Sequence, residues 1–191
     1  SIRRQRQMCI RDSVCMDHTA LGEAIGVAAL SGVPQGGLVL LLDSLPGDNG
    51  IRERLEAAKT LLRREGRQVR VFQWKPGDET LTDILQIERP DAVIAFEASA
   101  LSEAAVLIGE KEMPLLYGCG STPDIADALE RGRITAIAAV NVFSEGYLAV
   151  QIAAATARHQ PQSEVPVIAF SVVRKETMYQ SENQKLLFPM T

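Results

Sequence analysis

The sequence predicts an α/β fold, namely a doubly wound parallel sheet with helices on both faces. Short apolar runs alternate along the chain with amphipathic stretches, in the manner of repeated strand–helix–strand units. Most of the runs contain no alternating polar residue, which is typical of strands buried on both faces. With 191 residues, of which 46% are hydrophobic and 23% charged, the chain is long enough for one sizeable core.

Six apolar runs are predicted to be strands. They are Leu38–Leu42, Val69–Trp74, Ala92–Phe96, Leu115–Tyr117, Thr135–Val140 and Val165–Val173. We expect them to lie parallel in one layer, because the connections between them are long enough to cross over.

Helical spacing of apolar residues predicts the intervening elements. The expected helices are Ala20–Leu30, Ile51–Leu62, Leu81–Ile87, Leu101–Ile108, Ile125–Leu129 and a long one from Ser144 to Ala157. Their expected first residues or N-caps are Asp17, Asn49, Asp78, Ser99 and Thr122. Gly66 and Gly132 are predicted to end two of them, and Pro90 to stop a third.

The composition excludes several classes of protein. The formal net charge of −4 argues against a dedicated nucleic-acid binder, and three cysteines argue against a disulfide scaffold. Two histidines without neighbouring ligand types argue against a zinc site. No apolar run approaches the roughly 18 residues of a membrane span.

The first thirteen residues are predicted to be foreign to the fold. Residues 3–13 are similar, without a mismatch, to the translation of a transposase-type sequencing adapter. We therefore interpret 1–13 as a library scar and 14–191 as the domain. Without the scar's four arginines and one aspartate, the formal net charge falls from −4 to −7. On this interpretation the reading frame was cut at the scar, and an N-terminal portion of the protein is expected to be missing from this sequence.

Two positions admit more than one interpretation. Cys119 lies in the run Gly118–Ser121, after a strand and before a helix, where a nucleophile elbow would stand. The alternative is a tight glycine turn that presents backbone N–H groups to a crevice. Arg52 opens a helix at its positive end, which is either a placement for binding or a solvated arginine beside Glu53 and Glu56.

Several stretches resemble one family. They are Asp17–Gly22, Asp43–Leu55, Pro90–Phe96, Gly120–Pro123 with Gly132–Ile137 and Gly146–Ala149, and the ending Lys185–Pro189. Residues 14–191 resemble the type I periplasmic sugar-binding proteins and the lactose-repressor-type regulators that share their fold. The resemblance implies one lobe, the second, of a two-lobed fold, with 143–160 belonging to the first lobe.

Four polar residues, each following a different predicted strand, are the candidate ligand-binding residues: Arg52, Glu97, Ser121 and Asn141. The carboxyl ends of parallel strands meet at one edge, so we expect these side chains on one rim. Planar, bidentate groups suit the fixed hydroxyl array of a sugar. The chain departs from the family at Glu97, where Asn or Asp is common, and at Gly118–Ser121, where an Asp is common.

The resemblance implies an extracytoplasmic solute-binding protein that delivers a sugar or related polar molecule to an ABC transporter permease or a membrane sensor. It implies a periplasmic or extracellular location, compatible with a lipoprotein anchor. The alternatives are the effector domain of a lactose-repressor-type regulator and an α/β enzyme with Cys119 as nucleophile. In the first interpretation no catalytic residue, metal or cofactor is expected, and no nucleic acid binds this segment.

Overall fold

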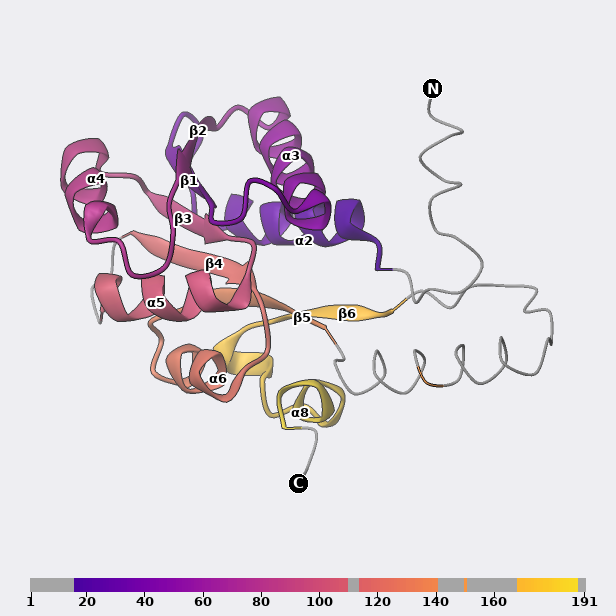
Figure 1. The fold of residues 1–191 in the computed structure, drawn as a ribbon. Coiled ribbons are helices and arrows are strands. Elements are labelled where there is room, and N and C mark those ends of the chain that lie inside the picture. Colours follow the sequence, from indigo (N-terminus) through magenta and orange to yellow (C-terminus); the bar gives the residue numbers. More distant parts are fainter. Residues whose placement is uncertain (1–15, 110–113, 141–149, 151–167, 189–191) are drawn as a thin grey trace.

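One mostly parallel sheet organises the chain (Figure 1). The structure, a computed structural model, describes residues 16–109, 114–140, 150 and 168–188. Its strands are β1 Leu38–Asp43, β2 Gln68–Gln73, β3 Ala92–Ala95, β4 Leu115–Cys119, β5 Ala136–Val140 and β6 Phe170–Val173. Their order in the sheet is β2-β1-β3-β4-β5-β6. The predicted α/β fold is thereby confirmed.

The last strand differs from the prediction. β6 is shorter than the expected run Val165–Val173 and pairs antiparallel with β5, whereas β1 to β5 pair in parallel. The chain leaves β5 at the carboxyl edge of the sheet and begins β6 at that same edge, and such a return gives an antiparallel neighbour. The sequence pattern identified an apolar run here but not its direction.

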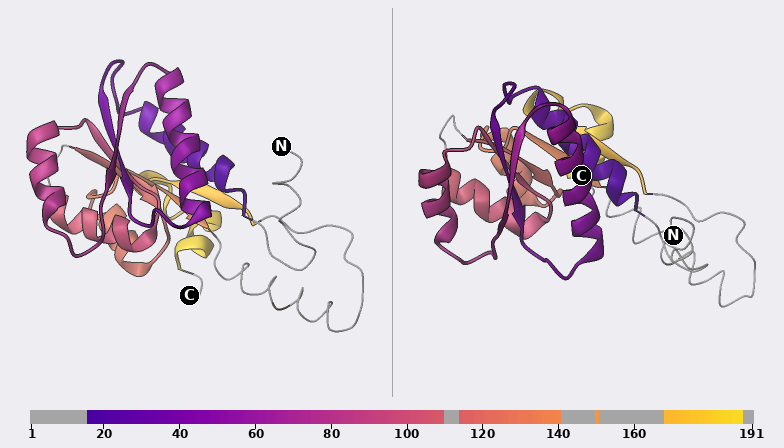
Figure 2. Two further views of the ribbon diagram at one scale, coloured as in Figure 1. Left: turned by 45° about the horizontal axis from the view of Figure 1, so that its top comes forward. Right: turned by 90° about the horizontal axis from the view of Figure 1, so that it is seen from above.

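Helices cover both faces of the sheet (Figure 2). They are α2 His18–Leu30, α3 Asn49–Arg64, α4 Thr80–Glu88, α5 Ala98–Ile108, α6 Pro123–Glu130 and α8 Ser181–Leu187, with a short 3-10 turn over Lys175–Thr177. Apolar residues of α2 and α3 pack on one face, and those of α4, α5, α6 and α8 on the other. The doubly wound arrangement is therefore present, with all residues of β3 and β5 buried.

Two helix starts agree with the prediction. The Asp17 carboxylate accepts a hydrogen bond from the Ala20 backbone N–H at 2.8 Å, so it caps α2. Thr122 is the N-cap of α6, with Pro123 in the first turn. The first N–H groups of a helix have no partner within the helix. Asp17 accepts from one of them in α2, and Pro123 has no N–H to satisfy in α6.

Three helix starts are corrected. Asp48, not Asn49, caps α3 by accepting from the Ile51 N–H at 2.8 Å. Glu97, not Ser99, caps α5. Glu79 is the N-cap of α4, although the expected Asp78 does accept from the Thr80 N–H at 3.1 Å. In the first two cases the carboxylate lies upstream of the predicted cap and accepts from N–H groups that follow it in the first turn.

The C-terminal elements were not predicted. In the 3-10 turn and α8, the Asn183 side-chain amide donates to the Thr177 carbonyl at 2.9 Å, and Met178 and Leu187 complete the core. Such short helices are stabilised by tertiary packing and show little sequence periodicity.

Several predicted features lie outside the described residues. These are the scar over 1–13, Asn141 and the helical segment 143–160 apart from Val150, which is helical and exposed. Among the residues that the structure does describe, no helix is long and apolar enough to cross a membrane.

Close packing of α2 on α3 gives a test of the fold. A Cβ atom on Gly22 would lie 2.1 Å from the backbone oxygen of Arg54. Gly22→Ala should therefore lower the free energy of unfolding by about 1–3 kcal/mol, despite the better helix propensity of alanine. Denaturant titration measures this loss, and Gly47→Ala, which has open space around it, is the matched control. Equal stability of the two variants would contradict the packing.

Candidate functional site

The candidate site lies at the carboxyl edge of the sheet. Adjacent parallel strands β1, β3, β4 and β5 end there, so the residues that follow them share one rim. Phe96 and Glu97 follow β3, and Gly120 and Ser121 follow β4. The helix α3, which carries Arg52, begins after the carboxyl end of β1.

Arg52 is exposed in the first turn of α3. Its Nη2 donates to the Asn49 Oδ1 at 2.6 Å. The positive end of a helix disfavours a cation, and the Asn49 oxygen offsets part of that cost. The guanidinium carries five N–H donors, so four remain after this bond. Arg52 is accordingly able to donate to a ligand at the rim.

Glu97 has a structural role that limits its availability. Its carboxylate accepts from the Ser99 N–H at 2.8 Å, the Ser99 hydroxyl at 2.6 Å and the Ala100 N–H at 3.1 Å. An ionised carboxylate offers about four acceptor positions, so about one remains. Glu97 therefore fixes the start of α5 first and can contribute only one further hydrogen bond to a ligand.

Ser121 connects two strand ends. Its hydroxyl donates to the Val140 carbonyl at 3.3 Å, which brings the residue after β4 to the last residue of β5. The hydroxyl oxygen keeps acceptor capacity for a ligand. Asn141 directly follows Val140 but lies outside the described residues. Glu97 and Ser121 follow the adjacent strands β3 and β4.

The glycine turn after β4 does not present the expected donor. The Gly120 N–H bonds to the Ala138 carbonyl at 3.2 Å, inside the sheet. The φ of Gly120 is 149°, and a Cβ there would lie 2.7 Å from the Ile125 Cδ1 atom. Glycine is thus required by backbone and space, and this N–H is not free for a ligand.

Cys119 is buried, and burial raises the pKa of its thiol to about 12, outweighing the opposing charge of Arg54. At neutral pH the thiol is protonated and enclosed, whereas nucleophilic cysteines need an accessible thiolate. The interpretation as an enzyme nucleophile therefore finds no support in this geometry.

Trp74 and Asp43 lie at the carboxyl ends of β2 and β1, near the candidate site. Trp74 is 1% exposed, and its indole N–H donates to the Asp78 carbonyl at 2.8 Å, so it is a core residue. Asp43 ends β1 half-buried, and burial raises the pKa of its carboxyl above the ordinary value.

Sequence reasoning missed Arg54. Its Nη1 donates to the Phe96 carbonyl at 2.8 Å, its Nε to the His18 Nδ1 at 3.1 Å and its Nη2 to the Met16 Sδ at 3.2 Å. A signal was present in the sequence: position 54 falls on the apolar stripe of α3 between Ile51 and Ala58, where a charged side chain needs buried partners.

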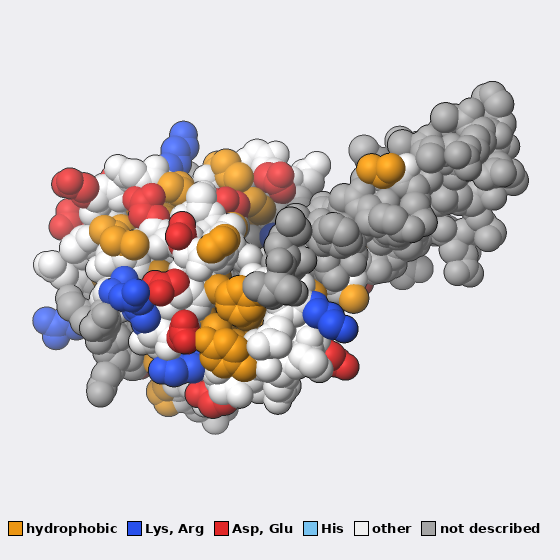
Figure 3. All heavy atoms as spheres, turned by 90° about the horizontal axis from the view of Figure 1, so that it is seen from below, with side chains coloured by type: hydrophobic (Ala, Val, Ile, Leu, Met, Phe, Trp, Pro, Cys, Tyr) orange, Lys and Arg blue, Asp and Glu red, His pale blue; other side chains and the backbone are white. Residues whose placement is uncertain are grey.

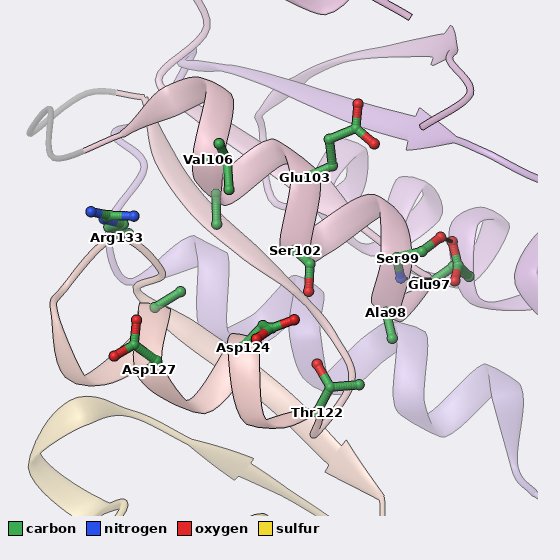
Figure 4. A pocket seen from close by; sticks show the side chains of 12 residues that line it. Glu97, Ala98, Ser99, Ser102, Glu103, Val106, Thr122, Asp124, Asp127 and Arg133 are labelled. Atoms are coloured by element: carbon green, nitrogen blue, oxygen red, sulfur yellow. Dashed lines mark hydrogen bonds between the residues drawn. The ribbon is translucent and has the colours of Figure 1, made fainter. Parts of the chain in front are cut away.

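A groove of about 740 Å³ lies beside the rim, between α5 and α6 (Figure 4). Its lining residues are Glu97, Ala98, Ser99, Ser102, Glu103, Ala105, Val106, Thr122, Asp124, Asp127, Ala128 and Arg133. Of the predicted ligand-binding residues it includes Glu97 but neither Arg52 nor Ser121. The groove is therefore distinct from most of the predicted rim.

No group of three potential metal ligands occurs within the described parts of the chain. On the face seen in Figure 3, acidic and basic side chains lie between small groups of apolar ones.

Comparison with solved structures shows a common fold. A solute-binding protein of an ABC transporter from Agrobacterium vitis, with bound D-fucose, is 14% identical, has a TM-score of 0.84, and is matched over 92% of this chain and 64% of that chain. A second A. vitis protein, bound with α-D-tagatopyranose, is 16% identical with a TM-score of 0.85, and the match covers 93% of this chain and 63% of that chain. A carbohydrate-transporter solute-binding protein from Agrobacterium radiobacter, in complex with D-arabinose, is 17% identical with a TM-score of 0.83, and the match covers 92% of this chain and 65% of that chain. The chain thus spans less than two thirds of these proteins.

The sequence also matches a family directly. No curated protein matches it, but the family described as periplasmic binding protein domain matches residues 10–161. The match includes the last four residues of the predicted scar. The strand order and the helices on both faces agree with one lobe of the type I fold. Because the match spans most of its 191 residues, this chain belongs to the periplasmic binding protein domain family.

Proposed function

We propose that this chain is part of an extracytoplasmic solute-binding protein whose ligand is a monosaccharide or a related polar molecule. The observation that carries the proposal is the set of polar groups at the carboxyl edge, with Arg52, Glu97 and Ser121 supplied from separate elements. Solved proteins of the same fold hold D-fucose, tagatopyranose and D-arabinose. These bound sugars support a sugar as the class of ligand. Which sugar binds depends on the residues at the carboxyl edge of this chain's sheet.

The chemistry of the rim suits a neutral polyhydroxyl molecule. Arg52 offers N–H donors, and Ser121 and Glu97 offer acceptors, so both functions of a sugar hydroxyl find partners. Asn141, the residue after β5, is the fourth proposed ligand-binding residue. Nothing in the proposal requires chemistry on the ligand, so the protein binds and releases its solute unchanged.

The proposed partner is the permease of an ABC transporter, or a membrane sensor. In two-lobed binding proteins, ligand shifts the population toward a closed state, and a partner can distinguish that state from the open one. We propose a periplasmic or extracellular location, with which a lipoprotein anchor is compatible. The alternative of a regulator's effector domain is not favoured, because the named structural neighbours are transport proteins.

Titration with D-fucose, D-tagatose and D-arabinose tests the proposed ligand class. One lobe binds a sugar weakly, since affinity depends on a complete set of contacts. In heteronuclear NMR spectra of the 191-residue chain, we expect sugar-induced shifts for the amides around Glu97 and Ser121. The amides of Gly36 and Arg67, at the opposite edge of the sheet, should not shift. Absence of shifts with all three sugars, or shifts confined to the α5–α6 groove, would contradict the proposal.

Replacement of Arg52 tests the rim residue most available to a ligand. Arg52→Ala should weaken sugar binding by about 1.5–3 kcal/mol, as for the loss of a hydrogen bond to a charged group. The same NMR titration gives the change in dissociation constant. Arg64→Ala removes an exposed arginine from the other end of the same helix and should leave binding unchanged. Equal binding by both variants would remove Arg52 from the site.

Alkylation of Cys119 tests the enzyme alternative. The buried, protonated thiol should react with iodoacetamide only after the chain is unfolded in urea, because the thiolate is the reactive form. Peptide-resolved mass spectrometry separates Cys119 from Cys9 and Cys15. Labelling of Cys119 in the folded chain at the rate of an exposed thiol would revive the nucleophile hypothesis.

A further inference from the structure

The loop between β2 and α4 is anchored at two points by contacts within the chain. Its residues 75–79 follow Trp74 and precede α4, and all of them are exposed. An exposed loop with few buried apolar contacts is ordinarily among the most mobile parts of a fold. The anchors of this loop therefore need a reason.

The first anchor is Trp74, the only tryptophan of the chain. It is buried in the same core cluster as Leu42 and Leu81. Its indole N–H donates to the Asp78 carbonyl at 2.8 Å, across the loop. Its backbone N–H donates to the Asp43 carbonyl at 3.1 Å and so continues the pairing of β2 with β1. One residue thus holds both the loop and the end of β1.

The second anchor comes from α5. The Glu103 carboxylate accepts a hydrogen bond from the Gly77 backbone N–H, 26 residues earlier in the chain. Gly77 has a φ of 91°, which glycine adopts without strain and other residues rarely adopt. Figure 4 shows the Glu103 side chain pointing away from Asp124 and Asp127 of α6. Although Glu103 lines the α5–α6 groove, its carboxylate is bonded to the loop.

The two anchors act on consecutive residues of one turn. Gly77 is held through its N–H, and Asp78 is held through its carbonyl. The Asp78 N–H donates to the Lys75 carbonyl at 3.1 Å, which closes the turn around Gly77. A hydrogen bond to an ionised carboxylate is roughly twice as strong as one between neutral groups. The bond to Glu103 is therefore the strongest contact that the turn makes.

The loop lies at the edge where the proposed ligand binds. β2 pairs in parallel with β1, so both strands end at the carboxyl edge of the sheet. Through Trp74 the loop is bonded to Asp43, whose half-buried carboxyl lies at that edge. A loop that is already held in place loses less conformational entropy when a ligand binds beside it.

We propose that Glu103 is a positioning residue of the ligand-binding edge, which holds the loop 75–79 through Gly77 and, together with Trp74, keeps the end of β1 in place. The part of this inference that concerns ligand binding rests on the proposed function, whereas the positioning of the loop does not. Position 103 needs an acceptor at the reach of a glutamate side chain, so glutamine should serve in part and alanine not at all.

Glu103→Ala, Glu103→Gln and the matched control Asp124→Ala test the proposal in the 191-residue chain. Asp124 is an exposed carboxylate of the same groove, on α6. Alanine is favourable inside a helix, so Glu103→Ala should fold. Two NMR readouts need no sugar: hydrogen exchange of the Gly77 amide and of the Trp74 indole N–H, which is the single indole signal of the chain.

In Glu103→Ala we expect both protons to exchange at least about tenfold faster, because the turn opens without global unfolding. The amide of Ile94, buried in β3, should keep its wild-type rate. Glu103→Gln keeps a neutral acceptor and should give intermediate rates, and Asp124→Ala should give wild-type rates.

Four results would overturn the positioning role. They are wild-type rates at Gly77 and Trp74 in Glu103→Ala, equal acceleration of these protons in Asp124→Ala, equal acceleration at Ile94, and rates in Glu103→Gln no closer to wild type than those in Glu103→Ala. The third result would mean that Glu103 only adds to global stability.

Titration with D-arabinose separates this inference from the proposed function. A dissociation constant at least about threefold higher in Glu103→Ala, with Asp124→Ala unchanged, would support both. A wild-type dissociation constant in Glu103→Ala would overturn the role in binding and leave the proposed function intact. Absence of shifts in the wild-type chain would contradict the sugar function, while the two exchange rates would still decide the positioning of the loop.

Discussion

The close approach of α2 to α3 is the contact on which the rest of the edge depends. Only a glycine at position 22 lets the helices come together at the backbone of Arg54. That approach places His18 over Gly50 and within hydrogen-bond distance of the Arg54 side chain. One steric condition between two helices thereby determines which polar groups face the ends of the strands.

Two charged groups at this edge, Arg54 and Glu97, have hydrogen-bond partners within the chain. The carbonyl of Phe96 and the imidazole of His18 solvate the cation of Arg54, and backbone N–H groups solvate the carboxylate of Glu97. Fixed charges with fixed partners do not need to reorganise on binding, which lowers the entropic cost of association. Replacement of either charged residue would leave its partners without these hydrogen bonds, and the cost would be largest at the buried Phe96 carbonyl.

The sequence predicted the elements whose signal is local and missed those decided by distant contacts. β1 and β3 were found because their runs are continuously apolar. The sequence predicts Ser99 as the cap of α5, whereas Glu97, two residues earlier, caps it in the structure. The choice between them depends on where β3 ends, and Arg54, 42 residues earlier than Phe96, holds that point. The position of Arg52 at the start of α3 predicts it as a ligand-binding residue. Arg54 lies instead on the same side of α3 as the buried residues Ile51 and Ala58, so it faces inward.

The way these charges are satisfied narrows the ligand that the edge can recognise. An anionic ligand would have to compete with the present acceptors of Arg54, and a cationic one with the helix N–H groups on Glu97. Three groups at the edge can still form hydrogen bonds with a ligand. They are the unused donors of Arg52, the acceptor capacity of the Ser121 hydroxyl and the half-buried carboxyl of Asp43, whose pKa is raised by burial. Hydrogen-bonding groups of this kind discriminate by the positions of hydroxyls, and a sugar presents such positions in a rigid ring.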